Sequence, residues 1–242
     1  MILCLETATF TCSVALNDGE CTLALRECLG QNAHSEKITI FIKEVLDEVG
    51  IGYHQLDAVA VSQGPGSYTG LRIGVSTAKG VCYAAGLPLM AIDTLHAMAF
   101  GMRSKLGATL QADDLLVPMI DARRMEVYCS VFDANLRRVS DTAAVIFDEN
   151  FQLSTLHGAE SSTVEGCAGS RYWFFGDGAP KLHQRFDCNT QIHIVDGFTP
   201  SAAYMAALSD QALKAGDFVD VAYFEPFYLK DFVAGKPHVK GL

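Results

Sequence analysis

The sequence predicts an α/β fold of two lobes, each built around a mixed sheet. Apolar strand segments alternate with helical segments, which is typical of parallel strand pairs. In addition, a three-strand pattern opens at Met1 and returns at Leu115, and in both copies the first strand ends in an acid, Glu6 or Asp121. This recurrence predicts duplicated β-β-β-α lobes that face each other across a cleft.

The first lobe is expected to begin with a strand meander and an amphipathic helix. Its strands lie at 1–5, 11–16 and 21–27. Apolar residues recur at helical spacing over 35–49, and Gly50 ends that helix. The elements that follow are a strand at 58–62, a small-residue helix at 71–85, a strand at 89–92 and a helix at 94–105.

The second lobe repeats the opening strands and then continues with shorter elements. The expected elements are strands at 115–120, 126–132, 139–147, 173–175 and 191–195 and a helix at 201–215. We place the first lobe at 1–106 and the smaller second lobe at 107–219. The segment 220–242 is expected to join the first lobe.

Composition narrows the class of protein. Half of the 242 residues are hydrophobic, which is enough for a sizeable core. The net charge of −10 opposes unaided binding to phosphate backbones. The eight cysteines form no C-x-x-C pair, which favours free thiols in a reducing cytoplasm. We find no apolar run that could serve as a signal peptide or membrane span, and we expect a cytoplasmic protein without membrane contact.

The most distinctive local motif is Gly64-Pro-Gly-Ser-Tyr-Thr-Gly-Leu-Arg-Ile-Gly74. It matches neither the phosphate loop G-x-x-x-x-G-K-[ST] nor the dinucleotide motif G-x-G-x-x-G. Gly70, Gly74 and Ala78 instead form a ridge of small residues along one helix face. Such a ridge lets another backbone approach closely, and that backbone is either a partner helix or this chain's own sheet. Arg72 could meet an anionic group or a surface carboxylate.

The two-lobed pattern resembles the actin, hexokinase and Hsp70 superfamily, in which ribonuclease-H-like lobes clamp a nucleotide between acid-bearing hairpins. In its enzymes a glycine in the first hairpin lets the backbone approach phosphate. Neither hairpin here has that glycine. We therefore interpret Glu6, Thr7, Asp121 and Asp177 as remnants of a nucleotide cleft. The hydroxyl groups after Glu6 either bind phosphate or, more simply, cap their own backbone.

Histidine and nucleophile patterns do not indicate a catalytic centre. No two of the seven histidines lie closer than ten residues in sequence, so no metal site is predicted. The G-x-S-x-G nucleophile elbow is absent. His34 precedes the first helix, where we expect it to be exposed.

Several ordered motifs together resemble the TsaB (YeaZ) family. They are Ile2-Leu-Cys-Leu-Glu-Thr-Ala8, Cys12-Ser-Val-Ala-Leu16, His34-Ser-Glu36, the glycine block, Asp121-Ala-Arg-Arg-Met-Glu-Val-Tyr128 and Pro226-Phe-Tyr-Leu-Lys230. The resemblance implies a non-catalytic scaffold in the complex that makes threonylcarbamoyladenosine beside the tRNA anticodon. Its implied partners are a catalytic TsaD-like subunit and a TsaE-like ATPase, and it forms a homodimer when alone. The resemblance further implies that tRNA is met only through the complex, that this subunit needs no cofactor, and that any ATP belongs to the complex.

The resemblance also implies an interface for TsaD on the first two helices. The residues assigned to it are His34, Ile38, Phe41, Ile42, Val45, Gly70, Arg72, Gly74 and Ala78. Two departures stand out: Met125 takes a place where many relatives have glycine, and Glu6 one where others have aspartate. Two other functions stay open: a glycoprotease-like metallohydrolase or stand-alone ATPase of the same superfamily, and a homodimer with an unrelated regulatory role.

Overall fold

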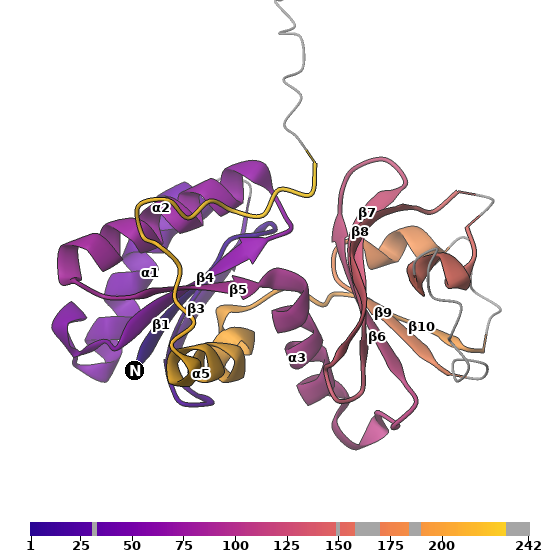
Figure 1. Cartoon of the computed structure of the whole chain (residues 1–242), viewed down its shortest axis with the longest axis horizontal. Helices are drawn as coiled ribbons and strands as arrows, with labels where there is room; N and C mark the ends of the chain where they lie inside the picture. Colours follow the sequence, from indigo (N-terminus) through magenta and orange to yellow (C-terminus); the bar gives the residue numbers. More distant parts are fainter. Residues whose placement is uncertain (31–32, 149–150, 158–169, 184–189, 231–242) are drawn as a thin grey trace, which may run out of the picture.

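Two five-stranded sheets with the same strand order form the framework of the protein. The computed structural model describes residues 1–30, 33–148, 151–157, 170–183 and 190–230. The lobes lie side by side, with helices between them (Figure 1). No helix among the described residues is long and apolar enough to cross a bilayer.

The first sheet contains the predicted meander and two parallel additions. Its strands are β1 (Ile2–Glu6), β2 (Thr11–Asp18), β3 (Cys21–Leu29), β4 (Ala58–Gly64) and β5 (Leu89–Asp93). Their order is β3-β2-β1-β4-β5, and β1 runs antiparallel to β2 but parallel to β4. Because β1 and β4 are buried on both faces, they read as continuous apolar runs.

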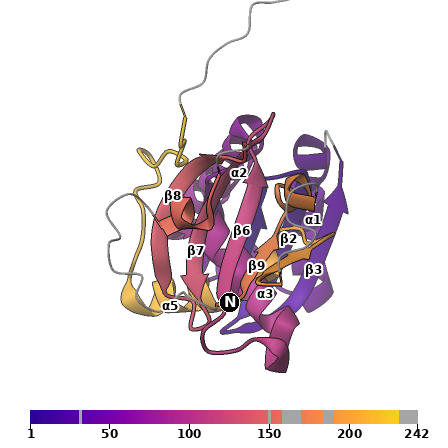
Figure 2. The same ribbon diagram turned by 90° about the vertical axis from the view of Figure 1, so that its right-hand side faces the viewer.

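The second sheet repeats this topology, with β6 in the place of β1. Its strands are β6 (Leu115–Asp121), β7 (Glu126–Asp133), β8 (Arg138–Ile146), β9 (Tyr172–Phe175) and β10 (Ile192–Val195). Figure 2 shows this sheet with its lobe toward the viewer. The order β10-β9-β6-β7-β8 confirms the prediction of two ribonuclease-H-like lobes with mixed sheets.

The helical part of the second repeat differs from the first. Between β8 and β9 the structure describes a short 3-10 helix, Leu153–His157, whereas residues 158–169 lie outside the described part of the chain. The predicted helix at 201–215 begins as a 3-10 turn, Ala202–Met205, and continues as α5, Ala206–Ala215.

Helices α1 (Ala33–Val49) and α2 (Tyr68–Ala85) cover one face of the first sheet. The α2 helix begins three residues before the predicted start at 71, because the Ser67 hydroxyl accepts a hydrogen bond from the Gly70 amide and caps it. Gly86 ends α2 in the left-handed conformation, which glycine adopts without strain.

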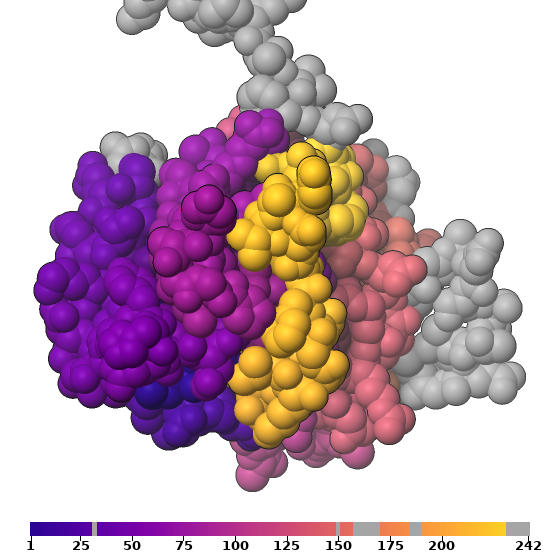
Figure 3. Space-filling view, turned by 60° about the vertical axis from the view of Figure 1, so that its left-hand side comes forward, coloured from indigo at the N-terminus to yellow at the C-terminus, as the bar shows by residue number. Residues whose placement is uncertain are grey.

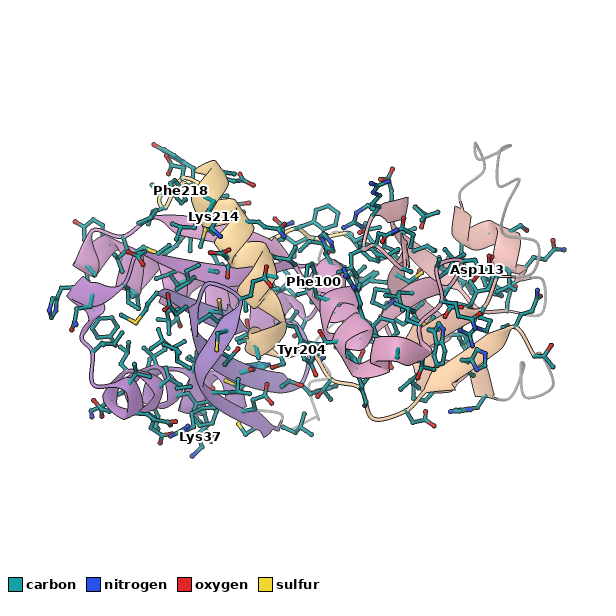
Figure 4. The ribbon with its side chains drawn as sticks, turned by 90° about the horizontal axis from the view of Figure 1, so that it is seen from below. Lys37, Phe100, Asp113, Tyr204, Lys214 and Phe218 are labelled. Carbon is teal, nitrogen blue, oxygen red and sulfur yellow. The ribbon has the colours of Figure 1, made fainter. Side chains whose placement is uncertain are left out.

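Two helices cross between the lobes. Leu95 and Met98 of α3 (Thr94–Leu106) pack with Phe175 in the core of the second lobe. In return, Ala202 and Met205, just before α5, pack with Ile2 and other residues of the first sheet. Figure 4 shows Phe100 of α3 and Tyr204 at this junction. Each lobe thus buries part of its core under a helix from the other predicted range. The limits 1–106 and 107–219 stay a prediction.

The chain returns to the first lobe after α5. The amide of Val219 donates to the Leu89 carbonyl at 2.9 Å, and the Phe227 amide donates to the Gln63 carbonyl at 2.7 Å. The Lys79 ammonium group on α2 also donates to the Ala222 carbonyl. In the space-filling view this segment lies across the surface between the first-lobe helices and the second lobe (Figure 3). The rest of the predicted addition, 231–242, lies outside the described residues.

Ser13 links β2 to the segment before α5, and its loss should destabilise the fold. Its hydroxyl accepts from the Ala202 amide at 2.8 Å and donates to Glu27 at 2.7 Å in a buried site. Ser13→Ala leaves that amide without its acceptor, so we expect a loss of about 1–3 kcal/mol in the free energy of unfolding. Chemical denaturation measures it, with Ser76→Ala on the exposed side of α2 as the control. Equal stabilities would refute this role.

Candidate functional site

The turn between β1 and β2 is the first candidate site, since it holds Glu6 and Thr7, which we interpret from the sequence as remnants of a nucleotide cleft. Glu6 and Thr7 are fully buried there. The Ala8 amide donates to Glu6 Oε1 at 2.6 Å, and the Thr7 amide donates to the Ser62 hydroxyl at 3.2 Å. These two groups are therefore engaged by this chain's own backbone and by β4. Of the turn hydroxyls, that of Thr9 accepts from the Thr11 amide at 3.4 Å, whereas those of Thr7 and Thr11 are buried without a hydrogen-bond partner among the described residues.

The glycine block closes over this turn. A Cβ atom on Gly66 would overlap the Ala8 carbonyl, and one on Gly70 would overlap the Thr7 carbonyl. A Cβ on Gly74 would overlap the Thr7 hydroxyl. The ridge thus gives room to the chain's own first hairpin, and its interpretation as room for a partner helix is wrong. Helix α2 therefore occupies the space through which a ligand would have to approach Thr7.

Burial also changes the acid–base behaviour of Glu6. Desolvation raises the pKa of Glu6 to about 7, an effect that the hydrogen bond from the Ala8 amide offsets only in part. Its second oxygen, Oε2, is buried and has no hydrogen-bond partner in the structure. A carboxyl group held in this way is poorly suited to position a magnesium ion, which needs charged and accessible oxygen ligands.

His34 is buried as well, which corrects the expectation that it is exposed. Its Nε2 lies 2.7 Å from the Thr9 carbonyl, and a carbonyl can only accept, so the neutral ring carries its proton on Nε2. Burial lowers the pKa of His34 and so favours this neutral form. His34 therefore ties the start of α1 to the first hairpin.

Most of the residues assigned to the partner interface lie in the interior. Ile38, Ile42, Val45 and Ala78 belong to the core between the sheet and its two helices. Their apolar spacing identified the inward face of α1, not its outward one. Of the nine assigned residues, Arg72 is exposed and Phe41 is half-buried. Whether α1 and α2 meet a partner is still a prediction, but other side chains would have to make that contact.

The second hairpin is open and holds its acids in ion pairs. Asp177 Oδ1 accepts from the Asp121 amide at 2.9 Å, so the structure brings these two residues together. The Lys181 ammonium group donates to Asp121 at 2.7 Å and to the Glu126 carbonyl at 2.8 Å. Burial and the nearby Asp121 raise the pKa of Asp177. Among the described residues, no group of three or more His, Cys, Asp or Glu side chains is placed to hold a metal ion.

Sequence reasoning did not find two contacts of the C-terminal segment, one to the second lobe through Lys230 and one to α2 through Tyr228. Lys230 forms an ion pair with Glu126 at 2.5 Å, and Arg72 donates to the Tyr228 hydroxyl at 3.2 Å. Both Lys230 and Tyr228 belong to the motif at 226–230 that contributed to the family resemblance. Their contact residues are far away in the sequence, so no local pattern reveals them.

Comparisons with known proteins place this geometry in a family. The chain is 32% identical to the tRNA threonylcarbamoyladenosine biosynthesis protein TsaB of Escherichia coli, over 97% of this chain and 96% of that protein. The chain belongs to the TsaB (YeaZ) family. The Haemophilus influenzae TsaB is also 32% identical, over 97% of this chain and 95% of that protein.

Two further comparisons fit this family. A family model described as "TsaD: tRNA N6-adenosine threonylcarbamoyltransferase" matches residues 29–236. A solved structure of YeaZ from Pseudomonas aeruginosa shares the fold with a TM-score of 0.74 and 23% identity, covering 94% of this chain and 99% of that one. The resemblance found in the sequence motifs is thus confirmed at the level of the TsaB family and its fold.

A pair of glycine variants on α2 tests the packing of the glycine block. Gly70→Ala should lower the free energy of unfolding by about 1–3 kcal/mol, because the methyl group meets the rigid Thr7 carbonyl. Gly80→Ala is the control, since a Cβ there meets nothing within 4 Å and should stabilise the helix by about 0.5–1 kcal/mol. Urea denaturation measures both. If Gly70→Ala is as stable as Gly80→Ala, the helix does not press on the turn.

The buried carboxyl group predicts a pH dependence of stability. The pKa of Glu6 is about 7 in the folded chain against 4.5 when solvated, so its contribution is complete below pH 4.5 and is lost as the pH rises through 7. Relative to Glu6→Gln, the wild type should lose on the order of 3 kcal/mol of unfolding free energy across this window. Denaturation of both proteins at several pH values measures the difference. A constant difference would mean that the carboxyl titrates normally.

Proposed function

We propose that this chain is an accessory subunit in the biosynthesis of tRNA threonylcarbamoyladenosine and has no catalytic centre of its own. The names of its TsaB relatives support the pathway. In this proposal the chain is a cytoplasmic scaffold that binds a TsaD-like catalytic subunit and works with a TsaE-like ATPase. It forms a homodimer when alone, and ATP is bound by the complex.

One observation carries the non-catalytic part of the proposal: the first hairpin is closed by the chain's own helix. An enzyme of this fold needs the hairpin backbone and its acid to approach phosphate and metal. Here Glu6 and Thr7 are fully buried beneath the glycine block, and the pKa of Glu6 is raised to about 7. The chemistry must then come from another subunit, which explains why the fold is kept without its open cleft.

The outward faces of α1 and α2 are the surface that we assign to the catalytic partner. Both helices cover one face of the first sheet, and they expose apolar side chains on their outer sides. Ile40 on α1 is 46% exposed and its neighbour in sequence, Phe41, is half-buried, while Tyr83 on α2 is 88% exposed. Exposed apolar groups on adjacent packed helices suit a protein partner.

Charged substitutions on these faces test the assignment. Ile40→Asp combined with Tyr83→Asp should weaken binding to the TsaD-like subunit about tenfold or more, because carboxylates would have to be desolvated in the interface. Ile146→Asp is the control, since Ile146 is similarly exposed but lies on β8 of the second lobe. Calorimetric titration measures the affinities, and light scattering measures the assembly. A wild-type chain that forms no complex, with or without ATP, would refute the proposal.

The enzymatic alternative requires a different outcome. The purified chain would have to hydrolyse ATP or peptides at an ordinary enzymatic rate, and Glu6→Gln or Asp121→Asn would have to abolish that rate. We choose Gln and Asn because they keep the side-chain shape at the buried Glu6 and at the ion-paired Asp121. We expect no such activity from the chain alone.

A further inference from the structure

The turn between β6 and β7 presents two adjacent arginines to solvent. Arg123 and Arg124 are both exposed, and their guanidinium groups have no hydrogen-bond or ion-pair partner within the described residues. Their φ angles are 71° and 52°, a region that residues with a Cβ atom rarely adopt. Glycine would suit this backbone better, so the turn keeps two cationic side chains in spite of its conformation.

The acidic residues at the base of the turn are already neutralised. Asp121 accepts hydrogen bonds from the Arg123 amide at 2.5 Å and from the Lys181 ammonium group at 2.7 Å. Glu126 is paired with Lys230 at 2.5 Å. Because Lys181 and Lys230 already balance the charge of these carboxylates, the carboxylates do not neutralise the guanidinium groups of Arg123 and Arg124 at the tip of the turn.

Cationic and aromatic groups continue from this turn to the first lobe. Lys230 closely follows Tyr228, whose hydroxyl accepts from Arg72 at 3.2 Å. The Arg72 guanidinium carbon lies 4.1 Å from the centre of the Tyr68 ring, and the Tyr68 and Tyr228 ring centres are 4.9 Å apart. We call Tyr68, Arg72, Arg123, Arg124 and Tyr228 the basic strip, and Lys230, which is already paired with Glu126, links its two parts. Figure 1 shows the segment that carries Tyr228 and Lys230 running from α2 toward β7 and β8.

We propose that the basic strip contacts the phosphate backbone of an RNA, namely the tRNA substrate of the complex, and this inference rests on the proposed function. Guanidinium groups bind phosphate oxygens through parallel N–H donors, and aromatic rings beside them can stack on bases. A strip that spans both lobes fits an extended polyanion better than a single carboxylate of a protein partner.

The overall charge limits the affinity of this contact, so the contact orients the RNA and contributes only modestly to the strength of binding. At a net charge of −10 the chain repels a polyanion over most of its surface, so the strip defines where RNA can approach. A few phosphate contacts supply modest affinity, so we expect the chain alone to bind RNA weakly. In the complex the strip orients a tRNA that the catalytic subunit also holds.

Fluorescence anisotropy with a labelled, unmodified tRNA transcript tests the proposal. The full chain is mixed with its TsaD-like subunit and titrated into the tRNA at several salt concentrations. Arg123→Ala with Arg124→Ala should weaken binding about tenfold near 100 mM salt and make the plot of log K against log salt shallower by about 1.5. Arg123→Gly with Arg124→Gly should do the same while unfolding at an equal or higher temperature, because glycine accepts the positive φ angles.

Arg103→Ala with Arg137→Ala is the matched control. Both residues are exposed and, in the described part of the chain, their guanidinium groups have no hydrogen-bond or ion-pair partner, so this pair removes the same charge from elsewhere on the surface. Equal loss of RNA binding in the control and test variants would overturn the proposal, because only net charge would then matter. Unchanged RNA binding with loss of the TsaD-like subunit would also overturn it, since the strip would then contact protein.

The test separates this inference from the proposed function. If the wild-type chain forms no complex with the TsaD-like subunit, the proposed function fails by that measurement. The strip is then tested by the same variants on the chain alone at low salt. If they bind the transcript as well as the wild type does, the inference fails too.

Discussion

The close approach of α2 to the first hairpin is the contact on which the rest of the structure depends. Gly66, Gly70 and Gly74 remove the side chains that would separate the helix from the turn. The helix backbone at Gly70 therefore meets the Thr7 carbonyl directly, and the Gly66 backbone just before the helix meets the Ala8 carbonyl, which places Glu6 in the interior. His34 closes the same turn through its bond to Thr9. A region that could admit a ligand in a related fold is thus occupied by protein.

The two lobes share one topology but treat the corresponding hairpin differently. In the first lobe the acid is buried and binds a backbone amide, so desolvation raises its pKa. In the second lobe the acid stays at the surface and is neutralised by Lys181. The first hairpin therefore contributes to packing, while the second presents charge. The open second hairpin is also where the C-terminal segment arrives.

Contacts between the lobes come from four parts of the chain. Helix α3 supplies core residues to the second lobe, and Met205 supplies one to the first. Arg138 on β8 pairs with Asp93 at the start of α3 at 3.0 Å. Lys230 adds a fourth connection through Glu126. These contacts hold the two lobes together.

The sequence by itself determined the elements, their order and the duplication, because apolar periodicity and turn residues depend on neighbours along the chain. It also led to the family, through motifs such as the glycine block. Only the tertiary structure decided what the ridge packs against, because a small-residue face fits the chain's own turn and a partner helix equally well. The same holds for α3, since the apolar pattern of a helix does not show which sheet the helix packs against. The ion pair of Lys230 with Glu126, 104 residues apart, depends on the folded path of the whole chain.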